Sequence, residues 1–287
     1  MIEIGQYNRL TAVRMTPHGM VLHDAEGDDV LLPNKYTPKE LAIGDAIDVF
    51  VYTDSEDWPI ATTRRPYAQL HEVAYLQAKE ITNIGAFLDW GLEKDLFVPF
   101  SEQGIKMVAG GRYFVYLYLD EESGRVAASS KLNKYLDQGT PDLSVGQEVQ
   151  LLIGPPTPLG FSAFINHRYR GLIYQSDIFR PLRPGDRCPG YIKLIRPDGK
   201  IDLSLQPQGY QQAVPAQAQQ ILDLLQARGG FLPLTDKSEP DEIYALLQMS
   251  KKAFKKALGA LYKARRVRLE DEGVYGLEPG PGGDQQA

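Results

Sequence analysis

The sequence predicts a mostly β chain with a small α+β domain at its carboxyl end. Two observations predict this fold class. One strand-rich unit occurs three times within residues 1–206, and after residue 215 the hydrophobic period changes from about 2 to about 3.6. The composition agrees, because 43% hydrophobic and 24% charged residues are typical of an ordinary globular protein.

The repeated unit ends in a predicted β-hairpin, found at residues 44–65, 110–131 and 185–206. The first hairpin reads GDAIDVFVYTDSEDWPIATTRR, which is an apolar run, an acidic turn and a Thr-rich run. A second strand-rich block precedes each hairpin and contains Gly19, Gly85 or Gly160. Each unit therefore supplies about five short strands, and closure into a small Greek-key barrel, the OB-fold, avoids open sheet edges.

The units also resemble the S1 RNA-binding domain, which has the OB-fold. The segment GAFL at residues 85–88 and the segment GLIYQS at residues 171–176 carry this resemblance. At the position where such domains place a base-stacking ring, the third copy has Tyr174, whereas the first two copies have Pro33 and Pro99. The resemblance therefore implies RNA binding by the third copy.

The last quarter of the chain predicts three helices and a hairpin. The first helix spans residues 216–228, and the second follows Ser238 as its N-cap and ends near Met249. The third follows Ser250 as its N-cap, and its apolar face consists of Phe254, Ala257, Leu258 and Leu261. Two strands are expected within residues 267–278, so the whole segment reads as a winged helix-turn-helix domain.

Three barrels followed by a winged helix resemble the conserved virulence factor B family of bacterial RNA-binding regulators. The segments GYIKLIRPDGKIDLSLQPQGY and MSKKAFKKALGALYK carry most of this resemblance. It implies an RNA-binding regulator without enzymatic activity. The predicted domains are three S1-type OB-folds at residues 1–65, 66–139 and 140–208 and a winged helix at residues 215–279.

The charge is distributed unevenly along the chain. The net charge is −6, with −5 in residues 1–65, −4 in residues 66–144, +3 in residues 145–214 and zero in residues 215–287. Residues 251–268 contain eight basic residues and no acidic one. Because phosphate binding depends on local cation density, this asymmetry favours a nucleic-acid surface in the carboxyl-terminal half.

We therefore predict that the third barrel and the winged helix together form one nucleic-acid-binding surface. Aromatic rings would stack on unpaired bases, and cations would hold the phosphates. Phe164 is included because it lies on the same strand face as residue 162, two positions earlier. The predicted residues are Phe164, His167, Arg168, Tyr169, Arg170, Tyr174, Lys193 and Arg196 in the barrel, and Lys251, Lys252, Lys255, Lys256, Lys263, Arg265, Arg266 and Arg268 in the winged helix.

The sequence predicts no enzyme, no cofactor and no metal site. Acidic groups at residues 54–57 and 120–122 read as hairpin turns, the four His residues lack ligand spacing, and Cys188 reads as packing. With no leader or membrane-spanning stretch recognised, we expect a cytoplasmic protein.

The predicted partner is single-stranded RNA. The acidic first two barrels are expected to act as spacers or as a docking surface for protein partners such as the ribosome. Two alternatives stay open. One is a DNA-binding transcription regulator that acts through the winged helix, and the other is a protein adaptor of the translation machinery.

Overall fold

A computed structural model of the chain describes residues 1–54, 56–137, 141–178, 181–207, 216–263 and 266–277. The chain divides into two compact units, Met1–Leu205 and Gln206–Ala287. Within the described residues, every helix is too short or too polar to span a bilayer.

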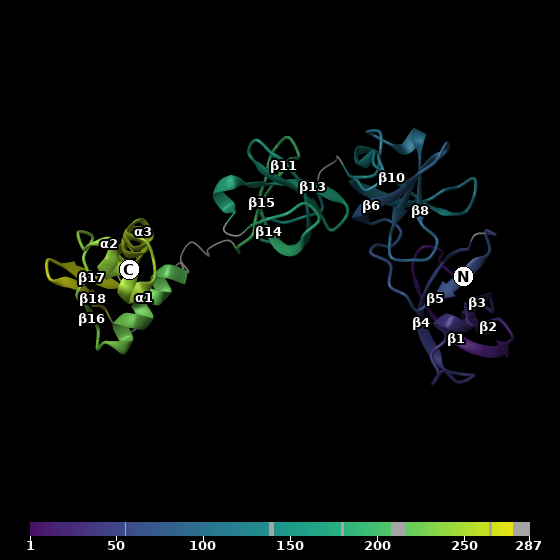
Figure 1. Cartoon of the computed structure of the whole chain (residues 1–287), viewed down its shortest axis with the longest axis horizontal. Coiled ribbons are helices and arrows are strands. Elements are labelled where there is room, and N and C mark those ends of the chain that lie inside the picture. The colour runs from purple at the N-terminus through teal and green to yellow at the C-terminus, as the bar shows by residue number, and fades with distance from the viewer. Residues whose placement is uncertain (55, 138–140, 179–180, 208–215, 264–265, 278–287) are drawn as a thin grey trace, which may run out of the picture. The chain divides into compact units, whose positions relative to one another are not determined.

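The first unit contains three closed five-stranded barrels, as the sequence predicts (Figure 1). Barrel one consists of β1 (Tyr7–Thr16), β2 (Gly19–His23), β3 (Asp29–Pro33), β4 (Ala46–Thr53) and β5 (Pro59–Thr62). Barrel two consists of β6 (Val73–Ile81), β7 (Gly85–Asp89), β8 (Leu96–Pro99), β9 (Arg112–Leu119) and β10 (Val126–Ser129). Barrel three consists of β11 (Glu148–Thr157), β12 (Gly160–Ile165), β13 (Tyr169–Tyr174), β14 (Arg187–Ile195) and β15 (Ile201–Ser204).

All three barrels have the same strand order. In barrel one the order is β1-β2-β3-β5-β4, and the corresponding strands follow the same order in the other two. The third and fifth strands of each barrel pair in parallel, whereas the other pairs are antiparallel. This arrangement confirms the predicted OB-type fold.

The glycine that recurs in each unit has a steric reason. Gly19, Gly85 and Gly160 begin the second strand of their barrels and lie opposite the last residue of the third strand. A Cβ at these positions would lie 2.1, 2.3 and 2.0 Å, respectively, from a carbonyl oxygen of that neighbouring strand. A side chain at any of these positions would push the two strands apart. The glycine therefore recurs in each unit because the two backbones approach closely there.

Barrel one packs against barrel two through the second half of β4, residues 49–53, which is buried on both faces. Val49 and Val51 point into the interior of barrel one. The alternate residues Phe50 and Tyr52 contact Trp90 of barrel two, with ring centroids 5.7 and 6.3 Å away. This apolar contact makes the first two barrels one packed body.

Barrel two also contacts barrel three. A buried cluster contains Val73 and Leu132 from the barrel-two side and Leu152 and Phe164 from barrel three. The ring of Phe164 lies 5.3 Å from the ring of Phe114 on β9. Barrel two therefore covers the outer face of β12 at Phe164.

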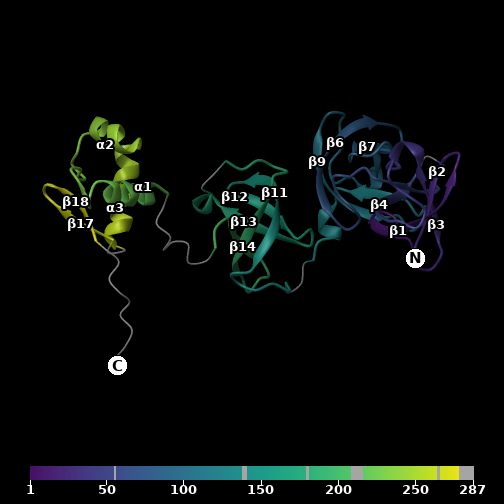
Figure 2. The same cartoon turned by 90° about the horizontal axis from the view of Figure 1, so that it is seen from below.

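The second unit has the helices and the hairpin that the sequence predicts, together with one short strand that it does not predict. Its elements are α1 (Ala216–Ala227), β16 (Phe231–Leu232), α2 (Pro240–Leu247), α3 (Lys251–Lys263), β17 (Val267–Glu270) and β18 (Gly273–Gly276). The strands form one sheet in the order β16-β18-β17. Figure 2 shows the three helices beside the hairpin of β17 and β18. The sequence does not predict β16, because a two-residue strand is too short to show a recognisable hydrophobic period.

One of the predicted helix caps is wrong. The N-cap of α2 is Glu239, which forms a capping box with Glu242, whereas the hydroxyl of Ser238 accepts the N–H of Thr235 at 2.9 Å. The cap of α3 agrees with the prediction, because the Ser250 hydroxyl accepts the N–H of Ala253 at 3.2 Å. The predicted apolar face of α3 is also buried.

Candidate nucleic-acid interface

The cations predicted in barrel three are mostly neutralised by carboxylates. Three of them form ion pairs: Arg168 with Asp137 at 2.6 Å, Lys193 with Asp177 at 2.8 Å, and Arg196 with Asp202 at 2.9 Å. The fourth, Arg170, lies over the ring of Phe164 at 5.4 Å, and partial burial lowers the pKa of its guanidinium. A phosphate would therefore have to compete with existing partners for most of these charges.

Two of the aromatic residues predicted to stack on bases are buried, and this part of the prediction is wrong. Phe164 is only 2% exposed because barrel two covers it. Tyr169 is 4% exposed in the interior of barrel three, and its hydroxyl accepts the N–H of Asp142 at 3.1 Å. Neither ring can receive a base in this arrangement.

The remaining two predicted rings of barrel three, His167 and Tyr174, are both half-buried but have different neighbours. His167 lies at the contact with barrel two, where its Nδ1 accepts the N–H of Val73 at 3.0 Å. Burial, opposed by Glu72, lowers the pKa of His167. Tyr174 is half-buried at the end of β13, and the Arg196 guanidinium lies over its ring and donates to its hydroxyl. His167 therefore serves the contact with barrel two, whereas the ring of Tyr174 lies against Arg196 of its own barrel.

The lysines of the winged helix have fewer carboxylate partners than the cations of barrel three. Lys252, Lys256 and Lys263 are exposed on the side of α3 opposite its buried face, and none of them meets a carboxylate within the described residues. Other cations have partners: Lys251 donates to the Lys237 carbonyl, Lys255 lies 3.8 Å from Asp236, and Arg268 pairs with Glu270 at 2.9 Å. Arg266 is half-buried, and Arg265 lies outside the described residues.

Barrel two carries an aromatic row that the sequence reasoning missed. Phe87 on β7 pairs with Phe97 on β8, Phe97 with Ala127 on β10, and Ala127 with Tyr118 on β9. The three rings are half-buried and point outward from the barrel, whereas the alternate residues Ala86 and Val98 lie in its core. The small side chain of Ala127 separates the rings of Phe97 and Tyr118 in this row.

A second ring group extends this row. Tyr135, which follows β10, stacks between Tyr116 and Tyr118 with centroid distances of 4.6 and 5.4 Å. Burial raises the pKa of Tyr118 to about 12, so its phenol is neutral at physiological pH. The stack therefore presents flat uncharged surfaces.

The row and the Tyr stack line one large groove of about 1180 Å³. Its cations are paired: Lys134 with Glu102 at 2.8 Å, Lys94 with Asp57 at 3.5 Å, and Arg125 with the same Asp57. Asp57 belongs to the acidic turn of barrel one, where Asp54 accepts the N–H groups of Glu56 and Trp58, as the turn interpretation expects. The groove therefore favours flat rings over phosphates.

Comparisons with known proteins agree with the domain types. Residues 219–275 match the CvfB-like winged helix domain, and residues 4–64, which form barrel one, match the S1 domain. The chain is 29% identical over 279 residues to the protein YitL of Bacillus subtilis, which covers 94% of this chain and 93% of YitL. It is 25% identical over 238 residues to conserved virulence factor B of Staphylococcus saprophyticus, with 80% and 79% covered.

A solved structure is similar along nearly the whole chain. It is a multidomain protein with nucleic acid binding domains from Streptococcus pneumoniae, with 23% identity, a TM-score of 0.39 and coverage of 96% of this chain and 98% of that one. The predicted family resemblance is confirmed by the domain matches and the homologues. S1-type barrels and winged helices are nucleic-acid-binding domains, which suggests a nucleic-acid-binding regulator.

Proposed function

Because this chain is a homologue of the conserved virulence factor B proteins and has a CvfB-like winged helix, we propose that it is a post-transcriptional regulator that binds single-stranded RNA without catalysis. The observation that carries the proposal is the open aromatic row of Phe87, Phe97 and Tyr118 on barrel two. In this proposal barrel two stacks bases, and the winged helix contacts phosphates.

The geometry of barrel two favours unpaired nucleotides. Bases in a duplex are stacked on one another, so only a single strand can offer a base face to a protein ring. Each stacked base contributes about 1–3 kcal/mol, and several rings in one groove can bind successive bases. The paired cations of the groove add little phosphate attraction, which leaves stacking as its main contribution.

The winged helix supplies the phosphate contacts in this proposal. Lys252, Lys256 and Lys263 can displace counterions from a nucleic-acid backbone because no neighbouring carboxylate in the described part of the chain neutralises them. Gly259 lies exposed in the middle of α3 and offers no side chain to read a base edge. Backbone contacts without base reading suit RNA better than a specific DNA site.

The proposal keeps part of the sequence-based site and relocates the rest. The α3 lysines remain, and Tyr174 remains as a half-buried predicted ring of barrel three. Phe164 and Tyr169 are withdrawn because they are buried, and Phe87, Phe97 and Tyr118 take over the stacking role.

Fluorescence anisotropy with the full chain tests this function. A labelled single-stranded RNA should bind, and unlabelled RNA of the same sequence should compete at least about tenfold better than duplex DNA. If duplex DNA competed better, the chain would be a DNA-binding regulator that acts through the winged helix. Absence of binding to any free nucleic acid would instead favour a protein adaptor.

A further inference from the structure

Two cations of the aromatic groove on barrel two are held by one carboxylate of barrel one. Lys94 lies in the loop before β8, Arg125 directly precedes β10, and both line the groove together with Phe97 and Tyr118. One oxygen of the Asp57 carboxylate lies 3.5 Å from the Lys94 ammonium, and the other accepts a hydrogen bond from the Arg125 guanidinium. The two cations therefore converge on a single anionic group.

This carboxylate offsets a repulsion between the two cations. Burial lowers the pKa of the Lys94 ammonium, and the charge of Arg125 lowers it further, whereas Asp57 opposes both effects. The hydrogen bond from Arg125 in turn holds the pKa of Asp57 below its ordinary value. An anion between the two cations is therefore favourable, and a phosphate oxygen can take the place of a carboxylate oxygen.

The three charged groups are open to solvent. The side chains of Lys94, Asp57 and Arg125 are 32%, 38% and 47% exposed, respectively, so a phosphate can reach the two cations from outside. Exposed ion pairs contribute little to stability, because water and salt screen them. Asp57 can therefore be displaced without unfolding either barrel.

A second carboxylate at the same barrel contact provides a matched reference. Glu93 of barrel two pairs with Lys35 and Arg64 of barrel one, so one carboxylate again crosses between the barrels to hold two cations. Its side chain is 43% exposed, close to the exposure of Asp57. Glu93, Lys35 and Arg64 are absent from the described lining of the aromatic groove. Both clusters can join the two barrels, whereas the cations held by Asp57 also line the groove.

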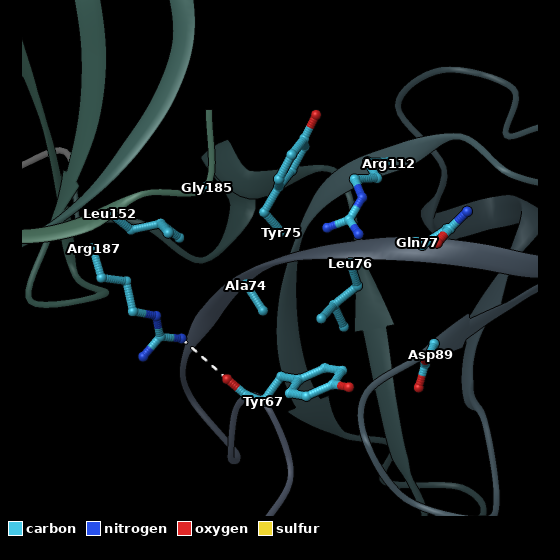
Figure 3. Close-up of a pocket in the computed structure, with 10 residues that line it drawn as sticks. All are labelled: Tyr67, Ala74, Tyr75, Leu76, Gln77, Asp89, Arg112, Leu152, Gly185 and Arg187. Carbon is cyan, nitrogen blue, oxygen red and sulfur yellow. Dashed lines mark hydrogen bonds between the residues drawn. The ribbon is translucent and has the colours of Figure 1, made fainter. Parts of the chain in front are cut away.

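The smaller cavity where barrels two and three meet has a different geometry (Figure 3). Its volume is about 400 Å³, and two arginines line it. Arg187 donates to the carbonyl of Tyr67 at 3.1 Å, whereas Arg112 lies away from it, on the side of Tyr75 and Gln77. These two arginines do not surround one acceptor as the cations of the aromatic groove do.

From this convergence we propose that Lys94 and Arg125 bind a phosphate of the RNA strand and that Asp57 occupies their site in the free protein. The inference rests on the proposed function, because it takes the same groove as the RNA-binding surface. A strand whose bases stack on Phe97 and Tyr118 carries its phosphates along the groove, where one of them replaces the Asp57 carboxylate. The groove then adds one phosphate contact to its stacking contacts.

The change Asp57→Asn tests this site in the full chain. Asp57 has a φ of 70°, in the left-handed region that Asn adopts as readily as Asp, so the variant removes the charge without straining the turn. In fluorescence anisotropy, labelled single-stranded RNA should bind this variant about three- to fivefold more tightly than the wild type, because the competing ion pairs are exposed and weak.

Two further variants keep the result specific. Glu93→Gln raises the net charge by the same one unit and breaks the matched ion cluster, and it should change RNA affinity less than about twofold. Arg125→Gln, introduced together with Asp57→Asn, should abolish the gain because the phosphate loses its guanidinium partner. Thermal unfolding of each variant verifies that it is folded.

The outcomes separate this site from the proposed function. The site is refuted if the wild type binds RNA but Asp57→Asn binds it no more tightly than Glu93→Gln does. It is equally refuted if the gain persists in the double variant with Arg125→Gln. In both cases the proposed function stands. If neither the wild type nor Asp57→Asn binds single-stranded RNA, the function and the site are both wrong.

Discussion

Barrels two and three present different side chains at the same four positions of the same sheet. In barrel two the row across the strands is Phe87, Phe97, Ala127 and Tyr118. In barrel three the corresponding row is Ser162, Leu172, Asp202 and Leu194. The strand order and the register of the glycine are shared, so the difference lies only in outward side chains. A shared backbone therefore does not imply a shared ligand.

Barrel one has a third set of side chains at these four positions. Its residues are Val21, Leu31, Ile60 and Tyr52. Tyr52 and Ile60 pack into the cluster that contains Trp90 of barrel two. The face that carries the aromatic row in barrel two thus packs, in barrel one, partly against the neighbouring barrel.

The largest expected effect comes from breaking this docking contact. Phe50 is fully buried against Trp90, so Phe50→Ala should lower the free energy of unfolding by about 3–5 kcal/mol. Phe87→Ala on the open row of barrel two should cost less than about 1 kcal/mol because that ring is half-exposed. Urea unfolding followed by tryptophan fluorescence measures both. Equal losses would mean that packing does not distinguish the docking contact of barrel one from the open row of barrel two.

The next effect concerns affinity and distinguishes barrel two from barrel three. The double change Phe87→Ala and Phe97→Ala should weaken binding of single-stranded RNA by about tenfold or more, since each lost stack contributes about 1–3 kcal/mol. Leu172→Ala is the matched control, because Leu172 occupies the position of Phe97 in barrel three. It should change affinity less than about twofold. If Leu172→Ala weakened RNA binding and the double variant did not, barrel three would be the barrel that stacks on bases.

A third effect separates stacking from charge. Replacing Lys252, Lys256 and Lys263 together with Ala should make the slope of log affinity against log salt about 2 smaller in magnitude, at about 0.7 per phosphate contact on a single strand. The Phe87 and Phe97 variant should lower the affinity with the slope unchanged. Anisotropy titrations at several salt concentrations measure both quantities. An unchanged slope in the lysine variant would remove α3 from the RNA surface.

The smallest effect is a pH dependence of barrel two. The pKa of Tyr118 is raised by burial from 10.0 to about 12, so above pH 10 the unfolded chain releases this proton before the folded chain does. The stability that Tyr118 contributes is complete below pH 10 and is lost as the pH rises toward 12. Chemical unfolding at pH 9 and pH 11 should show this loss, and Tyr118→Phe should reduce it. A variant that loses as much stability as the wild type would contradict the assignment.

The sequence was sufficient for the architecture because its signals are local. The recurring glycine marks a place where two strands approach closely, and the recurring hairpins predict strand pairs. Ser250 as an N-cap and the apolar period that follows it predict α3. The site was harder to predict because its determinants are distant in the sequence. The strand face of Phe164 was predicted correctly, but its burial depends on barrel two. The row of Phe87, Phe97 and Tyr118 exists only when four strands pair.

The burial of residues 49–53 of β4 on both faces has a practical consequence for dividing this protein. A cut near residue 65 would leave Phe50 and Tyr52 on one fragment and Trp90 on the other, all facing water. Such fragments would tend to aggregate, and a loss of activity in either could be mistaken for a missing ligand contact. Between Leu205 and Gln206, where the two compact units divide, a cut preserves each apolar core.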